Sequence, residues 1–492
     1  MSLKRDSIAL FSAKLISGLV SIFSVALLSR FLDIADYGLY RQWIVVTSFF
    51  TSVLSFGFPA AITYFLPRVK TQKEETLWLT NIIFSIATIS VVFVLSTPLV
   101  GYAVASLFSN DTLFKYNYLL TLSVAISLLI QIFPNLFIVK KNTRAILLFA
   151  IAPNVIWFLI LIFLVILKVS LEAYVFALLI KPVLDLFIGC LYSGRIFRFQ
   201  EIDWKFVKDI MKFSLPLGLS AIVGTIMLYT DKFVVGSMLT PKEFAVFVNG
   251  AYEIPFIGLI TASLFTVLTP RLTKAFFEER FETVRMDWMK AGKTLIPIMI
   301  SISCVIVFFA EPVVLALYSE KYLEAVPLFM VYQSMGVIRI YSYSSLFVAS
   351  GKTKLYLLNV ILSASLNLLL DIIMVRSFGA IGAALATVIS TFVLMALQIF
   401  QVKNITKSRK FSDTFPFNSF FGSICLSSII VGCVFLIARF VSGNLIVQFC
   451  FAFIAFLCSF YVLSKIVSND IMKALFSILR DFSRKFLKRG IR

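Results

Sequence analysis

The chain has 492 residues, of which 60% are hydrophobic and only 14% are charged, with a mean hydropathy of +0.98. Soluble domains are about 45–50% apolar and outer-membrane barrels alternate in segments of about 10 residues, so both classes are excluded by apolar runs of about 20 residues or more. The formal charge is +20, with no His. The positive-inside rule accounts for most of this charge, because Lys and Arg gather in cytoplasmic loops, so we do not expect nucleic acid as a partner.

The apolar runs predict an all-α polytopic membrane protein with about fourteen spanning helices. Lys4 and Arg5 precede the first run, as in a signal peptide, but that run is long and lacks a cleavage site, so we assign it as the first span. The predicted spans are residues 8–31, 40–66, 77–103, 117–139, 145–167, 171–194, 213–236, 244–269, 294–318, 323–349, 355–375, 379–402, 416–438 and 443–467.

Basic residues alternate between the two sets of loops, as the positive-inside rule requires. One set of loops is rich in Lys and Arg, with members at Arg68, Lys140, Arg195, Lys208, Arg271, Lys352 and Lys403. The other set carries little more than Arg30, Lys115, Lys168, Lys242, Lys321, Arg376 and Arg439. Because the alternation is unbroken over an even number of spans, we expect both termini in the cytoplasm.

A weak internal repeat predicts two pseudo-symmetric lobes of six helices each. Tyr37-Gly38-Leu39-Tyr40 is matched by Phe244-Ala245-Val246-Phe247 at an offset of 207 residues, and Asn142-Thr143-Arg144 by Lys352-Thr353-Lys354 at an offset of 210. The alternative is chance similarity among apolar helices. Two copies with an even number of spans share one orientation, so the pseudo-twofold axis is expected along the membrane normal, with the substrate path in a central cavity.

The repeat and the charge pattern together give the expected domains. These are an N-terminal lobe over residues 1–195, a cytoplasmic amphipathic linker over 196–212, a C-terminal lobe over 213–402, an extra helix pair over 403–468 and a basic amphipathic tail over 469–492. Such a tail is expected to lie on an anionic cytoplasmic leaflet; the alternative is a solvated basic segment.

Charged residues within the apolar spans are the candidate functional residues. A charge inside a span costs roughly 2.5–3.5 kcal/mol on insertion scales, so such residues are expected to face a wet interior. The bases at these positions predict a site for an anionic substrate, and the acids are candidates for coupling to an ion. The bases are Lys14, Arg41, Lys181, Lys232 and Arg339, and the acids are Glu253, Asp231, Asp185 and Asp371.

Lys14 and the pair Lys181 and Asp185 have a plain structural alternative, and Arg41 has a distinct expected role. Lys14 is near the cytoplasmic end of its span and could snorkel to the headgroups. Lys181 and Asp185 are four residues apart on one helix, where a self-neutralising pair is the simpler interpretation. Arg41 lies just inside the second span, where it is expected to guard the outer exit.

The remaining charged positions lie deeper or nearer the outer face. Arg339 and Glu253 are near the middle of their spans, where a cavity role is favoured over a structural ion pair, and the guanidinium fork of Arg suits a diphosphate. Adjacent residues point about 100° apart on a helix. We therefore expect one of Asp231 and Lys232 to face the cavity and the other the outer headgroups.

The sequence predicts no cofactor and no metal. All six cysteines lie in apolar spans without metal-ligand spacing, so we interpret them as small hydrophobic residues. Gly351-Lys352-Thr353 resembles the end of a phosphate-binding loop, but Leu346 stands where a glycine is required. Transport is therefore expected to draw on an ion gradient, the membrane potential or product removal.

At the level of whole segments the chain resembles the multidrug/oligosaccharidyl-lipid/polysaccharide (MOP) exporter superfamily, and in particular its polysaccharide repeat-unit flippases of the O-antigen type. The segments that carry the resemblance are LSRFLDIADYGLYRQW, LSFGFPAAITYFLPR, FSLPLGLSAIVGTIMLYTDKFVVG, LFTVLTPRLTKAF and SGKTKLYLLNVILSASLNLLLDIIMVRSFGAIGAALATVIST. They extend over the first twelve predicted spans. The extra helix pair is closer to lipid II flippases and some other polysaccharide exporters.

The resemblance implies a function and a location. It implies a bacterial inner-membrane protein, not an enzyme, that flips undecaprenyl-diphosphate-linked oligosaccharide, such as an O-antigen or capsule repeat unit, by alternating access. Membrane lipids and possible polymerase or chain-length proteins would be its partners. The alternatives are a cation-coupled multidrug exporter or a lipid II flippase of the same superfamily, and, less favoured, a membrane glycosyltransferase or polymerase.

Overall fold

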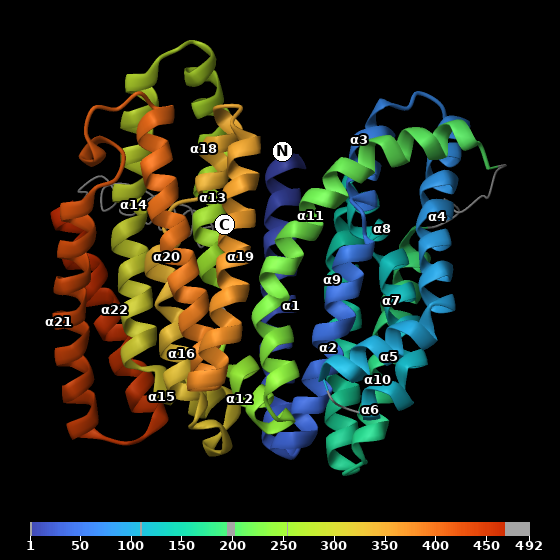
Figure 1. Ribbon diagram of the computed structural model, residues 1–492, viewed down its shortest axis with the longest axis horizontal. Coiled ribbons are helices and arrows are strands. Elements are labelled where there is room, and N and C mark those ends of the chain that lie inside the picture. The colour runs from blue at the N-terminus through green and yellow to red at the C-terminus, as the bar shows by residue number, and fades with distance from the viewer. Residues whose placement is uncertain (1, 109–110, 194–201, 253, 468–492) are drawn as a thin grey trace, which may run out of the picture. The chain divides into compact units, whose positions relative to one another are not determined.

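The computed structural model describes residues 2–108, 111–193, 202–252 and 254–467, and throughout these ranges the regular structure is helical (Figure 1). The chain forms two compact units. Unit 1 comprises Met1–Val248, Leu317–Lys321 and Asp371–Ala383, and unit 2 comprises Asn249–Ala316, Tyr322–Leu370 and Ala384–Arg492. The predicted all-α membrane fold is confirmed.

Unit 1 is built mainly from the first half of the chain. Side-chain caps start several of its helices: the Thr71 hydroxyl accepts from the Glu74 N–H, and Asn142 Oδ1 accepts from the Ala145 N–H at 3.0 Å. Its helices are α1 (Ser2–Phe31), α2 (Ile34–Leu54), α3 (Phe58–Phe65), η1 (Leu66–Arg68), α4 (Gln72–Leu95), α5 (Thr97–Phe108), α6 (Asp111–Lys115), α7 (Asn117–Ile130), α8 (Ile132–Val139), α9 (Thr143–Ile166), α10 (Leu171–Ser193), α11 (Trp204–Met238) and most of α12 (Pro241–Gly250).

Unit 2 has α14 at its centre, with α21 and α22 packed against it. A buried hydroxyl chain joins these three helices, because Ser459 Oγ lies 2.8 Å from both Ser301 Oγ and Ser427 Oγ. The remaining elements of this part of the chain are α13 (Pro255–Phe277), α14 (Phe281–Phe308), α15 (Ala310–Tyr318), η3 (Glu320–Tyr322), α16 (Ala325–Gln333), α17 (Met335–Ile338), α18 (Tyr343–Ala349), α19 (Thr353–Phe378), α20 (Ala380–Ile405), η4 (Phe411–Asp413), α21 (Phe417–Val441) and α22 (Leu445–Val467).

Each of the fourteen predicted spans falls on one or more of these helices, but several are interrupted. Among the described residues, ten helical segments, with α7 and α8 taken together, are long and apolar enough to cross a membrane, or eleven if α2 and α3, bent by 43° at their junction, count as one span. The predicted span 244–269 is divided between α12 and α13, and the predicted span 323–349 is divided among α16, α17 and α18. The count of fourteen is compatible with this arrangement and stays a prediction.

The helix boundaries repeat along the chain at the spacing that the sequence indicated. α1 and α11 end at Phe31 and Met238, and α2 and α12 begin at Ile34 and Pro241, an offset of 207 in both cases. α9 and α19 begin at Thr143 and Thr353, an offset of 210. The internal repeat is therefore confirmed in the order and bounds of the helices.

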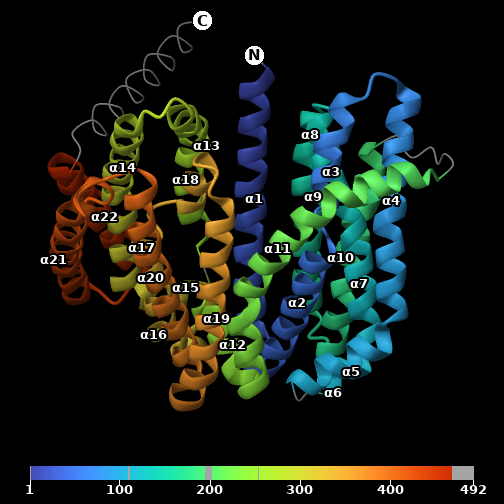
Figure 2. The same ribbon diagram turned by 45° about the horizontal axis from the view of Figure 1, so that its top comes forward.

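The predicted linker is continuous with the predicted seventh span, because both belong to α11. Aromatic side chains fix its first turns to unit 1: Phe206 meets Trp78 with ring centroids 4.5 Å apart, and Phe213 stacks on Tyr64 at 4.2 Å. Figures 1 and 2 show α11 starting beside α4 and ending next to α12. The expected lobe boundaries stay predictions, and the expected tail lies outside the described residues.

The repeat counterparts α2 and α12 meet at a glycine. A Cβ atom added to Gly38 would lie 1.9 Å from the carbonyl oxygen of Pro241, a separation that no side chain can adopt. Gly38 therefore allows the first turns of these two helices to touch within unit 1. This is the position at which the sequence repeat has Gly38 aligned with Ala245.

Candidate functional site

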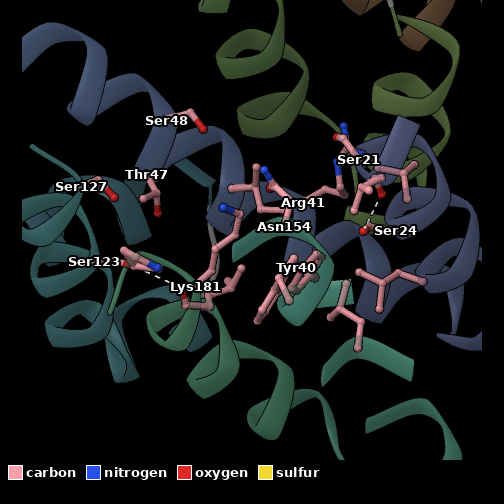
Figure 3. A pocket seen from close by; sticks show the side chains of 18 of the residues that line it. Ser21, Ser24, Tyr40, Arg41, Thr47, Ser48, Ser123, Ser127, Asn154 and Lys181 are labelled. Atoms are coloured by element: carbon pink, nitrogen blue, oxygen red, sulfur yellow. Dashed lines mark hydrogen bonds between the residues drawn. The ribbon is translucent and has the colours of Figure 1, made fainter. Parts of the chain in front are cut away.

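A cavity of about 360 Å³ lies inside unit 1, between α1, α2, α7, α9 and α10. Hydroxyl, amide and charged groups from all five helices face it, and Figure 3 shows the side chains of Arg41, Asn154 and Lys181 directed toward the same space. The polar residues that line it are Ser21, Ser24, Tyr37, Tyr40, Arg41, Thr47, Ser48, Ser123, Ser127, Asn154, Lys181 and Asp185.

Helical spacing explains why these polar residues reach one cavity. Ser123 and Ser127 are four residues apart on α7, and therefore lie on one face of that helix. Asn154 is fixed by its own helix and by α1, because its Nδ2 donates to the Ala150 carbonyl at 2.7 Å and to Ser17 Oγ at 3.3 Å.

Arg41 is held by its own helix and directs a cation at the cavity. Its Nη1 donates to the hydroxyl of Tyr37 at 3.0 Å, one turn earlier, and the guanidinium carbon lies 5.7 Å from the centre of that ring. Its Nε is buried with no hydrogen-bond partner among the described residues. A buried guanidinium donor without a partner is costly, and an anion in the cavity would satisfy it.

Lys181 and Asp185 form the ion pair that their spacing predicts. Lys181 Nζ donates to Asp185 Oδ2 at 3.0 Å, and the two side chains are 32% and 19% exposed. The expected self-neutralising ion pair is therefore confirmed. Both residues also line the cavity, so they remain candidates for the functional site. The described wall of this cavity thus carries two bases and one acid.

Arg339 lies in a different cavity, inside unit 2. This cavity has a volume of about 240 Å³ and is lined by residues of α13, α14 and the α16–α18 segment. Arg339 follows the end of α17, at the break before α18, and it is exposed. The sequence grouped Arg339 with Arg41 and Lys181; the structure places it in a cavity of its own.

A third group of charges lies within unit 1 on α11 and α19. Lys232 Nζ donates to Asp231 Oδ1 at 3.1 Å, so these neighbours pair with each other instead of facing different surroundings. Asp371 is fully buried, and both of its carboxylate oxygens have no hydrogen-bond partner in the described part of the chain. Asp231 and Lys232 are the charged groups that act on it electrostatically.

Two predicted positions have no described side chain. Lys14 lies on α1, in a stretch whose side chains are not described, and Glu253 lies outside the described residues. Sequence reasoning missed Asn154, Tyr40 and the serines of α7. The pair Ser123 and Ser127 was a signal that could have been used, since polar residues at helical spacing within an apolar span indicate an inward face.

Solved structures with the same fold include a flippase and a multidrug transporter. A lipid II flippase MurJ in an inward closed conformation matches with a TM-score of 0.73 and 19% identity, over 94% of this chain and all of MurJ. An inward-facing MATE multidrug resistance transporter of the MOP superfamily matches with a TM-score of 0.64 and 15% identity, over 82% of this chain and 99% of its own. This chain therefore has the multi-pass membrane fold of MOP-superfamily transporters.

Sequence comparison gives the family. The profile of the family described as "Polysaccharide biosynthesis protein" matches residues 3–276, more than half of the chain. The capsular polysaccharide biosynthesis protein CapF of Staphylococcus aureus is 24% identical over 240 residues, which are 45% of this chain and 60% of CapF, less than two thirds of its length. The chain belongs to the polysaccharide biosynthesis protein family.

The cavity in unit 1 should be open to water. In a variant lacking the six native cysteines, Thr47→Cys and Ser127→Cys, both in the cavity wall, should react with a membrane-impermeant maleimide. Leu159→Cys, on the exposed apolar face of α9, is the matched control and should stay unlabelled because lipid covers it. Equal protection of all three positions would contradict a wet cavity.

Proposed function

We propose that this protein flips a polyprenyl-diphosphate-linked oligosaccharide, such as an O-antigen or capsule repeat unit, across the bacterial inner membrane by alternating access. The observation that carries the proposal is the pair of bases, Arg41 and Lys181, in one polar cavity within the membrane-spanning part of unit 1. Family membership and the likeness to CapF support a role in polysaccharide assembly. The loop charges support a cytoplasmic location for both termini.

The cavity chemistry suits a diphosphate joined to a sugar. Arg41 presents a guanidinium, which binds phosphate oxygens with two parallel hydrogen bonds. Lys181 adds a second cation, whose charge Asp185 offsets until an anion arrives. Hydroxyl groups on α1, α2 and α7, with the rings of Tyr40 and Trp157, supply the hydrogen bonds and apolar faces that sugars require.

The charge of the cavity separates this proposal from the drug-exporter alternative. A cationic drug would be bound best by a wall with more acids than bases, whereas the described wall has Arg41 and Lys181 against Asp185 alone. The lipid II alternative shares the diphosphate chemistry. The two substrates differ only in the glycan. The lipid-linked intermediate that accumulates in a strain without the gene therefore distinguishes the two functions.

We further propose that Asp371, together with Asp231, couples transport to a cation or a proton. A fully buried carboxylate without a hydrogen-bond partner is costly in a membrane-spanning helix unless it binds a proton or a positive ion. Asp371 meets that description, and Asp231 is the acid beside it. Lys232 already pairs with Asp231. We therefore assign Lys232 to balancing the negative charge of these carboxylates and not to binding the substrate.

Replacing Arg41 should disable flipping. In a strain that lacks the gene, lipid-linked glycan should accumulate on the cytoplasmic face, and expression of the Arg41→Gln variant should restore less than about a tenth of the surface glycan, since a charge-assisted bidentate contact is lost. Arg376→Gln, at an exposed arginine near the end of α19, is the control and should restore it. Full complementation by Arg41→Gln, or accumulation of lipid II instead, would refute this assignment.

Replacing Asp371 should remove the response to the coupling ion. The apparent unfolding temperature of the purified wild type should rise with Na⁺, or change with pH between 5 and 8, because a bound ion stabilises the folded state by mass action. Asp371→Asn should flatten the response, whereas Asp209→Asn, an exposed carboxylate on α11, should keep it. A flat response in the wild type would exclude coupling at this group.

A further inference from the structure

The ion pair of Lys181 and Asp185 places a carboxylate inside the cavity of unit 1. Lys181 Nζ donates to Asp185 Oδ2 at 3.0 Å, and the side chain of Asp185 is 19% exposed. Within the described part of the chain, this carboxylate has no other hydrogen bond or ion pair. Asp185 therefore depends on Lys181 to stay ionised in a membrane-spanning helix, where an uncompensated charge is costly.

No other base takes the place of Lys181 in the described surroundings of Asp185. α10 packs against α2, α7, α8 and α9, and of these helices α2 alone brings described titratable groups to the cavity wall, namely Tyr37, Tyr40 and Arg41. Among the described residues Arg41 makes no ion pair with Asp185, and its Nη1 donates to the Tyr37 hydroxyl. The described wall residues of α1, α7 and α9 are uncharged.

Neutral donors of the wall are already engaged by backbone carbonyls. Pro182 has no N–H, which leaves the carbonyl of Leu178 without its helical hydrogen bond, and Ser123 Oγ donates to that carbonyl at 3.5 Å. Asn154 Nδ2 donates to a backbone carbonyl of its own helix at 2.7 Å. These two donors are therefore committed elsewhere when Asp185 loses its lysine.

Charge balance shows what an anion in this cavity does to the pair. Arg41 and Lys181 are directed toward the same space (Figure 3) and supply two positive charges. A diphosphate that is esterified at both ends carries two negative charges, which these two cations balance. Asp185 then keeps a negative charge beside the anion, and a nearby like charge favours the protonated form of a carboxyl group. One proton on Asp185 restores neutrality.

We infer that Asp185 is a proton-binding site that is filled when an anion engages Lys181, so that the lipid-linked substrate and one proton bind unit 1 together. The proton comes from the aqueous phase and returns to it when the anion leaves and Lys181 pairs with Asp185 again. The inference rests on the proposed function for the identity of the anion. This proton is distinct from the ion proposed at Asp371, which lies on another helix.

The test measures binding of dimethyl diphosphate, with one methyl ester on each phosphate, to the purified full-length protein in nanodiscs. This probe carries the diphosphate of the substrate but has no group that titrates near neutral pH, so a change with pH reports the protein. Because the complex holds a proton that the free protein lacks, the affinity should rise as the pH falls, by up to about tenfold per pH unit. Calorimetry in buffers of different ionisation enthalpy should show uptake of about one proton per bound diphosphate.

Variants assign the proton to its site. Asp185→Asn should bind the probe with no pH dependence and no proton uptake, because its amide does not ionise. Asp209→Asn, at an exposed carboxylate on α11, is the matched control and should behave as the wild type. Binding that is independent of pH in the wild type would overturn the inference, as would proton uptake that persists in a folded Asp185→Asn protein.

A second measurement needs no ligand. Lys181→Gln removes the cation that the anion would engage, so Asp185 should carry a proton at neutral pH. The infrared spectrum should then show a protonated carboxyl band that is absent from the wild type and from the double variant Lys181→Gln/Asp185→Asn. An ionised Asp185 in Lys181→Gln would refute the inference. Failure of the probe to bind the wild type would count against the diphosphate site of the proposed function, and the infrared band would still decide whether Asp185 takes a proton.

Discussion

The cost of placing a charge inside a membrane governs this structure. Each charged side chain within an apolar span needs a partner of opposite sign or contact with water, and both solutions occur. Lys181 pairs with Asp185 and Lys232 with Asp231, whereas Arg41 lines a cavity. Asp371 is fully buried and its carboxylate oxygens have no hydrogen-bond partner among the described residues, which makes it the group that most requires an ion.

The internal repeat shows in the order and bounds of the helices. Those bounds keep the offsets of 207 and 210 residues between the two halves of the chain. The cavity of unit 1 is lined from α1, α2, α7, α9 and α10, whereas that of unit 2 is lined from α13, α14 and the α16–α18 segment. The two halves of the chain therefore form their polar cavities from different sets of helices.

Much of the fold could be predicted from the sequence, because apolar runs, loop charge and the repeat each act over many residues. The ion pair of Lys181 and Asp185 followed from helical spacing alone. The separation of Arg339 from Arg41 could not be predicted, since hydropathy reports depth in the membrane and not which cavity a side chain enters. The electrostatic interaction of Asp371 with Asp231 and Lys232 joins residues about 140 positions apart in sequence, which spacing on one helix cannot reveal.

The central claim is that a lipid-linked glycan crosses the membrane through this protein. The direct measurement uses proteoliposomes loaded on one leaflet with a radiolabelled polyprenyl-diphosphate oligosaccharide, and a membrane-impermeant glycosidase outside. The account predicts that the glycan becomes accessible to the glycosidase only when the protein is present, and that excess unlabelled lipid-linked glycan competes. Efflux of a cationic dye from the same vesicles, without any transfer of glycan, would contradict it.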